Sequence, residues 1–184
     1  MAYNMKDVFY LDTSIDTTTG AGDGLATLDL SSYVDPIARG RSKGTGLAIY
    51  KVHFDISSAD GNAPVPAGTT GTFRAALLSF SGLPATAVGS TINFNDDQLS
   101  ATNDLTIAGV DFYAGGTAAG DPAPHVFVMP SAEVPYVVVR DQVVLAIDVT
   151  TQMSTTARVG VRLECAQVTL DQSTLNQLLR TQTV

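Results

Sequence analysis

The segment VPYVVVRDQVVLAIDV, from Val134 to Val149, constrains the fold more than any other part of the chain. Two runs rich in β-branched residues meet at Arg140 and Asp141, and such residues favour strands. The two charges indicate either a tight reversal or a long strand that crosses a rim of the molecule. In the second run apolar and polar residues alternate, which predicts one buried and one solvated face. The expected buried set is Val143, Leu145, Ile147 and Val149, opposite Gln142, Ala146 and Asp148.

Seven further segments show the alternation or the short apolar runs that predict strands. They are residues 8–15, 25–30, 47–56, 72–80, 104–113, 126–129 and 158–170. The stretches between them are rich in glycine, proline and threonine and are predicted loops. The alternating patterns exclude a parallel α/β sheet and predict an all-β protein, an antiparallel β-sandwich of about eight strands.

Some of these segments carry finer expectations. The chain's best alternation, in residues 47–56, predicts one face made of Ala48, Tyr50, Val52, Phe54 and Ile56. Gly109 predicts a bulge in the strand over residues 104–113, and residues 126–129 are expected to form a short buried strand that Pro130 ends. In residues 158–170 the apolar phase changes before Val168. This change predicts a bulge near Ala166 or Gln167, or a strand that leaves the domain and packs elsewhere.

The length of the chain selects among sandwich folds. Eight strands with long connections in 184 residues favour a single jelly-roll domain over residues 1–184. The immunoglobulin sandwich usually needs only about 100 residues and shorter loops. An immunoglobulin-like fold remains the alternative.

The last segment, residues 171–184, differs from everything before it. Ser173 can cap a helix, and Leu175, Leu178 and Leu179 follow at helical spacing. A helix of about two or three turns is too short to be stable alone, so this C-terminal helical tail must dock. It docks either on its own sandwich or on a neighbouring subunit. In the second case the three leucines form the subunit interface.

The charge balance argues against direct nucleic-acid binding. The formal net charge is −8, whereas sequence-independent binding to phosphates needs clustered Lys and Arg. The local basic group of Arg39, Arg41 and Lys43 lies among glycines and is predicted to be a solvated loop. Only 15% of residues are charged, which suits surfaces that pack against other protein copies but is equally typical of secreted β-domains.

The amino-terminal sequence predicts neither export nor membrane insertion. It lacks the apolar core of a signal peptide, and no apolar run reaches the roughly 18 residues that span a bilayer. The chain is therefore expected to be a soluble protein made in a cytoplasm.

The inventory of reactive residues predicts no catalytic site and no cofactor. His53 and His125 are not paired with each other, and His53 with Asp55 is better explained as a solvated strand surface than as a catalytic pair. Cys165 lies in phase with an apolar strand face, which predicts a buried, inert thiol. A glycosidase needs two acids across a cleft, and Glu164 is expected on an outward face in phase with Arg162.

The densest group of oxygen ligands is Asn93, Asn95, Asp96 and Asp97. Calcium needs six to eight oxygens, and this spacing lacks the central glycine and the closing glutamate of a calcium loop. No metal site is therefore predicted, although the sequence leaves open whether Asp96 and Asp97 hold a cation.

The chain resembles the single-jelly-roll major capsid proteins of tailless icosahedral viruses of archaea and bacteria, which have an internal membrane. The resemblance rests on strands that begin near residue 8, long Gly/Thr/Ala loops, the late strand pair PYVVVRDQVVLAIDV, a last strand and a short terminal helix. It implies a structural protein of the virion, made in the host cytoplasm, that forms homo-oligomeric capsomers. A related capsid protein and a nearby internal membrane are implied partners.

One feature of the residues agrees with that subgroup. A coat protein that binds its genome normally carries a basic arm, whereas Lys6 is the only cation among residues 1–20. Two alternatives stay open. One is a carbohydrate-binding or adhesive β-sandwich, disfavoured because the chain has no Trp and its Tyr and Phe are scattered. The other is a subunit of a surface layer or filament.

Overall fold

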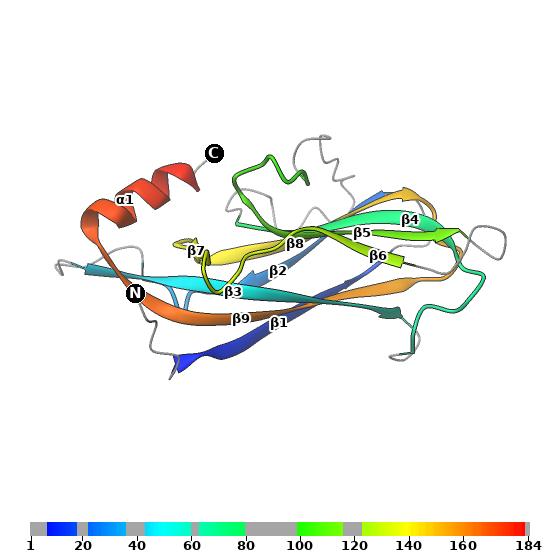
Figure 1. Ribbon diagram of the computed structural model, residues 1–184, viewed down its shortest axis with the longest axis horizontal. Coiled ribbons are helices and arrows are strands. Elements are labelled where there is room, and N and C mark those ends of the chain that lie inside the picture. The colour runs from blue at the N-terminus through cyan, green and yellow to red at the C-terminus, as the bar shows by residue number, and fades with distance from the viewer. Residues whose placement is uncertain are drawn as a thin grey trace.

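The protein folds into two antiparallel β-sheets that face each other, with one helix at the carboxyl end (Figure 1). The computed structural model describes residues 7–17, 22–35, 43–59, 63–79, 99–115 and 123–182. The four-stranded sheet has the order β1 (Phe9–Asp16), β9 (Ala157–Asp171), β3 (Lys43–Ser58), β7 (Tyr136–Val138). The five-stranded sheet has the order β2 (Gly22–Asp29), β8 (Gln142–Thr151), β4 (Thr70–Leu78), β5 (Thr106–Gly115), β6 (Ala123–Val128). Helix α1 spans Gln172–Thr181.

The strand pairs are nested in the sequence, which is the pattern of a rolled-up hairpin. β1 pairs with β9, β2 with β8, β3 with β7 and β4 with β5, all antiparallel. Successive pairs alternate between the two sheets. This arrangement of eight strands is a jelly roll, so the predicted fold class is confirmed. The ninth strand, β6, extends the five-stranded sheet beyond β5.

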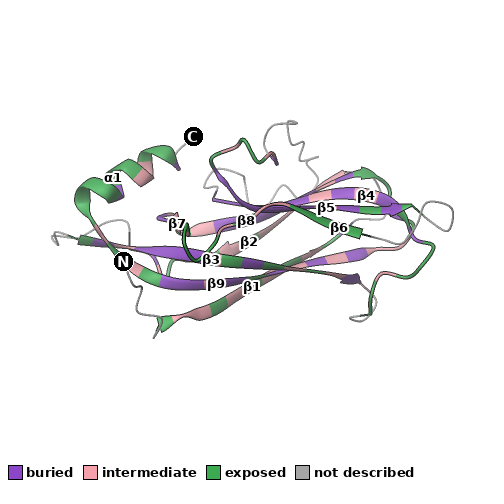
Figure 2. Cartoon of the chain, in the orientation of Figure 1, coloured by how far each residue is buried: buried purple, intermediate pink, exposed green. Residues whose placement is uncertain are grey.

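The segment around Arg140 crosses the rim of the sandwich. β7 and β8 belong to different sheets, so the chain passes from one sheet to the other between Val138 and Gln142. The four residues predicted inward from β8 are all buried. Ala146, expected on the wet face, is also buried, because it packs with Ala76, Leu78 and Leu99. Both faces of the centre of this sheet are therefore covered (Figure 2).

The predicted inward face of β3 is wrong at its first two positions. The register of β3 with β9 shifts between Ile49 and Lys51, which leaves Tyr50 as the extra residue of a bulge. A shift of one residue exchanges the two faces of a strand. Leu47 and Ile49 therefore join Val52 in the main core cluster, in place of Ala48 and Tyr50.

The register between β5 and β6 shifts between Gly109 and Val110, but the extra residue is Phe127, so the bulge predicted at Gly109 lies in the partner strand β6. The prediction of a buried strand at residues 126–129 is wrong. β6 is the last strand of its sheet, and its first four residues are exposed. The apolar side chains of this segment cover the edge of the sheet. The Phe127 ring lies over Gly109, where a Cβ atom would be 2.1 Å from Cζ.

The burial pattern of β9 changes after Cys165 as predicted, but the bulge that accompanies it lies in the partner strand β3.

The tail docks on its own domain. Asp171 caps α1 by accepting a hydrogen bond from the Thr174 N–H at 2.7 Å. Leu175 is fully buried beside Gly44 of β3. Within the described part of the chain, no helix has the length and apolarity needed to cross a membrane.

Candidate functional site

The outer face of the four-stranded sheet carries a group of charged side chains from three strands. His53 Nε2 lies 2.7 Å from Glu164 Oε1, across the β3–β9 ladder. Arg162 lies two residues before Glu164, on the same face of β9. Its guanidinium group stacks over the Tyr10 ring at 4.3 Å. Arg158 donates two hydrogen bonds to Asp16, at 2.6 and 3.0 Å, and lowers the pKa of that carboxyl group. The sequence predicted that Glu164 faces outward with Arg162, but it did not identify Glu164 as the partner of His53.

A shallow depression of about 370 Å³ lies among these side chains. Gly160 is among the residues that line it, and a Cβ atom there would meet only Asp55 atoms, at 3.7 Å. Asp12, His53, Asp55, Arg158 and Arg162 surround it. The depression offers acceptors and donors of both charges, but the described residues contain no group of three His, Cys, Asp or Glu that could hold a metal ion. Asn93, Asn95, Asp96 and Asp97 lie outside the described residues.

The structure places Cys165 in the core, as predicted, and His125 on an exposed strand. The Cys165 side chain is fully buried in the main core cluster, and its Sγ–H donates to the Phe9 carbonyl at 3.5 Å. Burial raises the pKa of this thiol to about 12, so the thiolate is scarce at neutral pH. His125 is exposed on β6, opposite Asp111 of β5.

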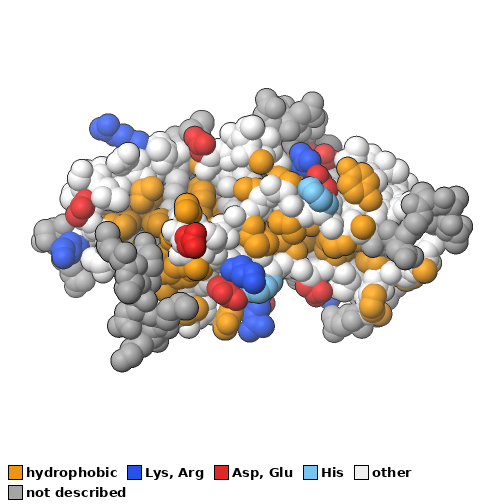
Figure 3. All heavy atoms as spheres, viewed as in Figure 1, with side chains coloured by type: hydrophobic (Ala, Val, Ile, Leu, Met, Phe, Trp, Pro, Cys, Tyr) orange, Lys and Arg blue, Asp and Glu red, His pale blue; other side chains and the backbone are white. Residues whose placement is uncertain are grey.

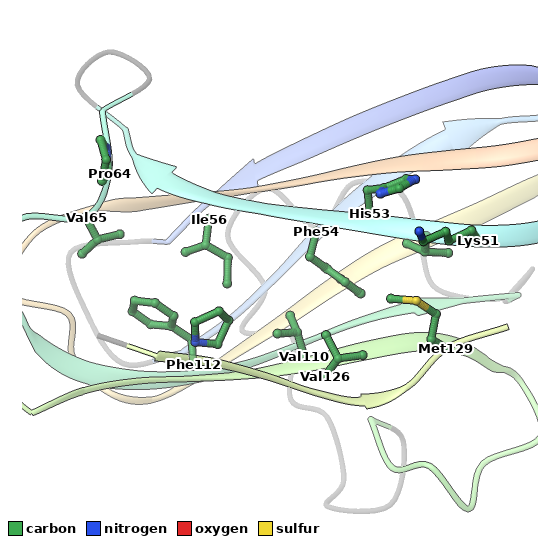
Figure 4. A pocket seen from close by; sticks show the side chains of 12 residues that line it. Lys51, His53, Phe54, Ile56, Pro64, Val65, Val110, Phe112, Val126 and Met129 are labelled. Carbon is green, nitrogen blue, oxygen red and sulfur yellow. The ribbon is translucent and has the colours of Figure 1, made fainter. Parts of the chain in front are cut away.

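A second opening in the described surface lies between the edges of the two sheets. It has a volume of about 430 Å³ and lies between β3 of one sheet and β5 and β6 of the other. Phe54 and Ile56 point into it from β3, and Val110, Val126 and Met129 approach from the opposite side (Figure 4). We call this opening the edge groove. Hydrophobic side chains gather in a band along this side of the molecule (Figure 3).

The short length of β7 causes the edge groove. β3 has 16 residues, but β7 has only three and pairs with Leu47 to Ile49. Beyond Ile49 no described strand lies along this side of β3, apart from an isolated bridge between Ser57 and Pro64. This opening was not predicted from the sequence, because the length over which two strands pair depends on the tertiary structure.

Exposed apolar side chains continue from the groove. Val126 is 44% exposed and Met129 is 37% exposed, and Val134 in the connection to β7 is 74% exposed. The Lys51 side chain is the one permanent charge among the residues that line the groove. Exposed sheet edges with apolar surroundings are sites of association unless they are covered.

The three leucines of the tail are not equivalent. Leu175 is buried against its own domain, whereas Leu178 and Leu179 are half-buried. Gln182, just after α1, is buried and anchors the tail. Its side chain accepts hydrogen bonds from the Val139 N–H at 3.1 Å and from the Ser79 hydroxyl at 3.2 Å, and it donates to the Val137 carbonyl at 2.7 Å. The role of the leucines at a subunit interface stays a prediction.

No family model matches the chain, and no curated protein sequence matches it. Among solved structures, the chain is similar to VP1 of Trichodysplasia spinulosa-associated polyomavirus, determined in complex with GM1 oligosaccharide. The superposition has a TM-score of 0.49 at 10% sequence identity and covers 92% of this chain and 96% of the viral chain. The jelly-roll fold of this chain follows from its own nested strand pairs.

Proposed function

We propose that the chain is a structural subunit that assembles with copies of itself into a shell of the viral capsid type. The observation that carries this proposal is the edge groove, an apolar opening of about 430 Å³ beside an unpaired stretch of β3. A second chain that covered this groove would remove its apolar side chains from water. This burial stabilises a contact by about 25 cal/mol for each Å² of apolar surface. The jelly roll is also a fold that recurs in capsid proteins, which is an argument by analogy.

The finer features of the proposal come from the sequence. Shell contacts are made between protein chains and not through the genome, because the net charge is −8 and the first 20 residues contain one cation. The mature protein is part of the virion, with a related capsid protein and an internal membrane as further partners. Leu178 and Leu179, half-buried on α1, are candidates for a second contact between subunits.

The assembly of the purified full chain tests the proposal. We expect native mass spectrometry to detect closed oligomers at micromolar protein concentration, and electron micrographs to contain rings, shells or shell fragments. Apolar interfaces of about 1,600 Å² in total are typical of such contacts. A chain that stays monomeric up to millimolar concentration would contradict the proposal.

A carbohydrate-binding module is the second candidate function. The depression over Gly160 favours it, because carboxylates, guanidinium groups and the 52% exposed Tyr10 lie on one strand face. Sugars are commonly bound by such polar groups beside an aromatic ring. Retention of a monomeric chain on a glycan array, lost in the Arg162→Ala variant and kept in Arg180→Ala, would support this function instead.

A further inference from the structure

The two long edges of the sandwich differ in charge. One edge is formed by β1 and β2, the outermost strands of their sheets, which together carry Asp12, Asp16, Asp23 and Asp29 and no Lys, Arg or His. We call it the acidic edge. The other is formed by the open stretch of β3 (residues 51–56) and by β6, and it contains the edge groove. Its residues include Lys51, His53 and His125 and a single acid, Asp55. We call it the grooved edge.

The backbone of the grooved edge has groups open to a further strand at Phe54. Ser58 donates its N–H to the Ala63 carbonyl, on the side of β3 away from β9. Because the N–H and C=O groups of a strand alternate in direction from one residue to the next, those of Phe54, which is only partly buried, point to the same side as those of Ser58. No described strand lies beside them. An added strand would bond to these groups and cover the apolar side chains below.

The acidic edge has the complementary form. The inward residues of β1 alternate with exposed ones, and Phe9, Leu11 and Ile15 are only partly buried although they contact the core clusters. Among the described strands, β1 pairs with β9 alone and β2 with β8 alone, so no described strand lies along the outer side of either. A neighbour at this edge would complete the burial of those apolar side chains.

We propose that the grooved edge of one copy receives the acidic edge of the next copy, so that β1 of the second copy lies beside β3 and its β2 lies beside β6. This inference rests on the proposed function and names the contact through which assembly occurs. The strand directions make the arrangement self-consistent. β1 and β3 are both antiparallel to β9, so they are parallel to each other. In the same way β2 is parallel to β4 through β8, and β4 is parallel to β6 through β5, so β2 is parallel to β6.

One orientation of the neighbour therefore suits both sheets. In that orientation, β1 meets β3 as a parallel strand and β2 meets β6 as a parallel strand. The contact joins two different surfaces, so it is heterologous, and repetition closes into a ring if the rotation between copies allows closure. Asp16 and His53 are paired within their own chain, with Arg158 and Glu164. The other aspartates of the acidic edge lie at the contact with Lys51 and His125 of the next copy, which favours this pairing over grooved edge against grooved edge.

Two single substitutions test the contact, one on each edge. Val126→Asp places an acid in the groove opposite the incoming aspartates, and Asp12→Lys places a cation on the acidic edge. Both positions are exposed or partly exposed, so folding should be retained, and thermal melts of each variant check this. We expect each substitution alone to lower the association constant of the contact about tenfold or more, since 1.4 kcal/mol of repulsion and desolvation suffices for that factor. Matched controls are Thr150→Asp and Thr150→Lys, at an exposed position of the interior strand β8, and these should assemble like the wild type.

The mixture of the two variants gives the decisive result. The Asp12→Lys chain keeps an intact grooved edge and the Val126→Asp chain keeps an intact acidic edge, so together they should form complexes with equal numbers of the two chains, which neither variant forms alone, in native mass spectra. If the wild type assembles and both variants still assemble, the edge contact is wrong and the proposed function stands. A dimer of Asp12→Lys alone would show grooved edge against grooved edge and overturn the inference. A wild-type chain that remains monomeric overturns both the contact and the proposed function.

Discussion

Replacing Gln182 with alanine is expected to lower the free energy of unfolding by about 2–4 kcal/mol, although the residue lies two positions from the end of the chain. Its amide is buried and joins three groups: the Ser79 hydroxyl, the Val139 N–H and the Val137 carbonyl. Removing the amide leaves the buried Val139 N–H and the partly buried Val137 carbonyl without this partner. Unpaired buried groups cost more than the net gain of a hydrogen bond.

Chemical denaturation of the full chain measures this effect. Gln177→Ala is the matched control, because Gln177 lies on the exposed side of α1 and has the same side chain. We expect the control to change the free energy of unfolding by less than about 0.5 kcal/mol. Equal effects of the two substitutions would show that Gln182 does not anchor the tail. The further change Gln182→Glu would bury a charge and should be at least as destabilising as Gln182→Ala.

Gly71 is the second position where a small change has a large expected effect. Its φ angle is +130°, which side chains rarely adopt. A Cβ atom would lie 2.7 Å from Met153 Cα and 2.8 Å from the Gln152 carbonyl oxygen. Both neighbours belong to the backbone of the segment that follows β8, so they cannot turn aside as a side chain does. Gly71→Ala should destabilise the fold by about 3 kcal/mol or more, from backbone strain plus overpacking.

The matched control for Gly71 is Gly160→Ala. A Cβ atom at Gly160 would meet only Asp55, at 3.7 Å, which is an ordinary contact. In an extended strand, this substitution should be neutral or slightly stabilising, because alanine reduces the freedom of the unfolded chain. Midpoints of thermal unfolding for the two variants compare them directly. A Gly71→Ala variant that melts within about 2 °C of the wild type would contradict the strain argument.

Much of the strand pattern could be predicted from the sequence because one face of most strands is buried. The alternation of Val143, Leu145, Ile147 and Val149 is an example, and all four are buried. Errors arose where a neighbour changed the environment. Ala146 is buried by Leu99, from a distant segment, and β6 is exposed because its sheet ends there. The bulge at Tyr50 moved Ile49 inward, and no residue type in that run marks a bulge.

The candidate surfaces were harder to predict than the fold. His53 and Glu164 lie far apart in the sequence and meet because β3 pairs with β9, with Lys51 opposite Glu164. The edge groove exists because β7 is short, and the length of β7 could not be read from residues 134–139 alone. The tail was predicted to dock on either its own domain or a neighbour. Leu175 and Gln182 bind its own domain, and the second possibility remains for Leu178 and Leu179.

Hydrogen–deuterium exchange of the dilute monomer and of the assembled protein tests the central claim most directly. The amide of Phe54 lies on the open side of β3, so we expect it to exchange rapidly in the monomer. Assembly should slow its exchange by about tenfold or more, together with amides of β1 and β6, while β4 in the sheet centre is slow in both states. Equal exchange of Phe54 in monomer and assembly would contradict the account, since the groove would then remain open in the assembled protein.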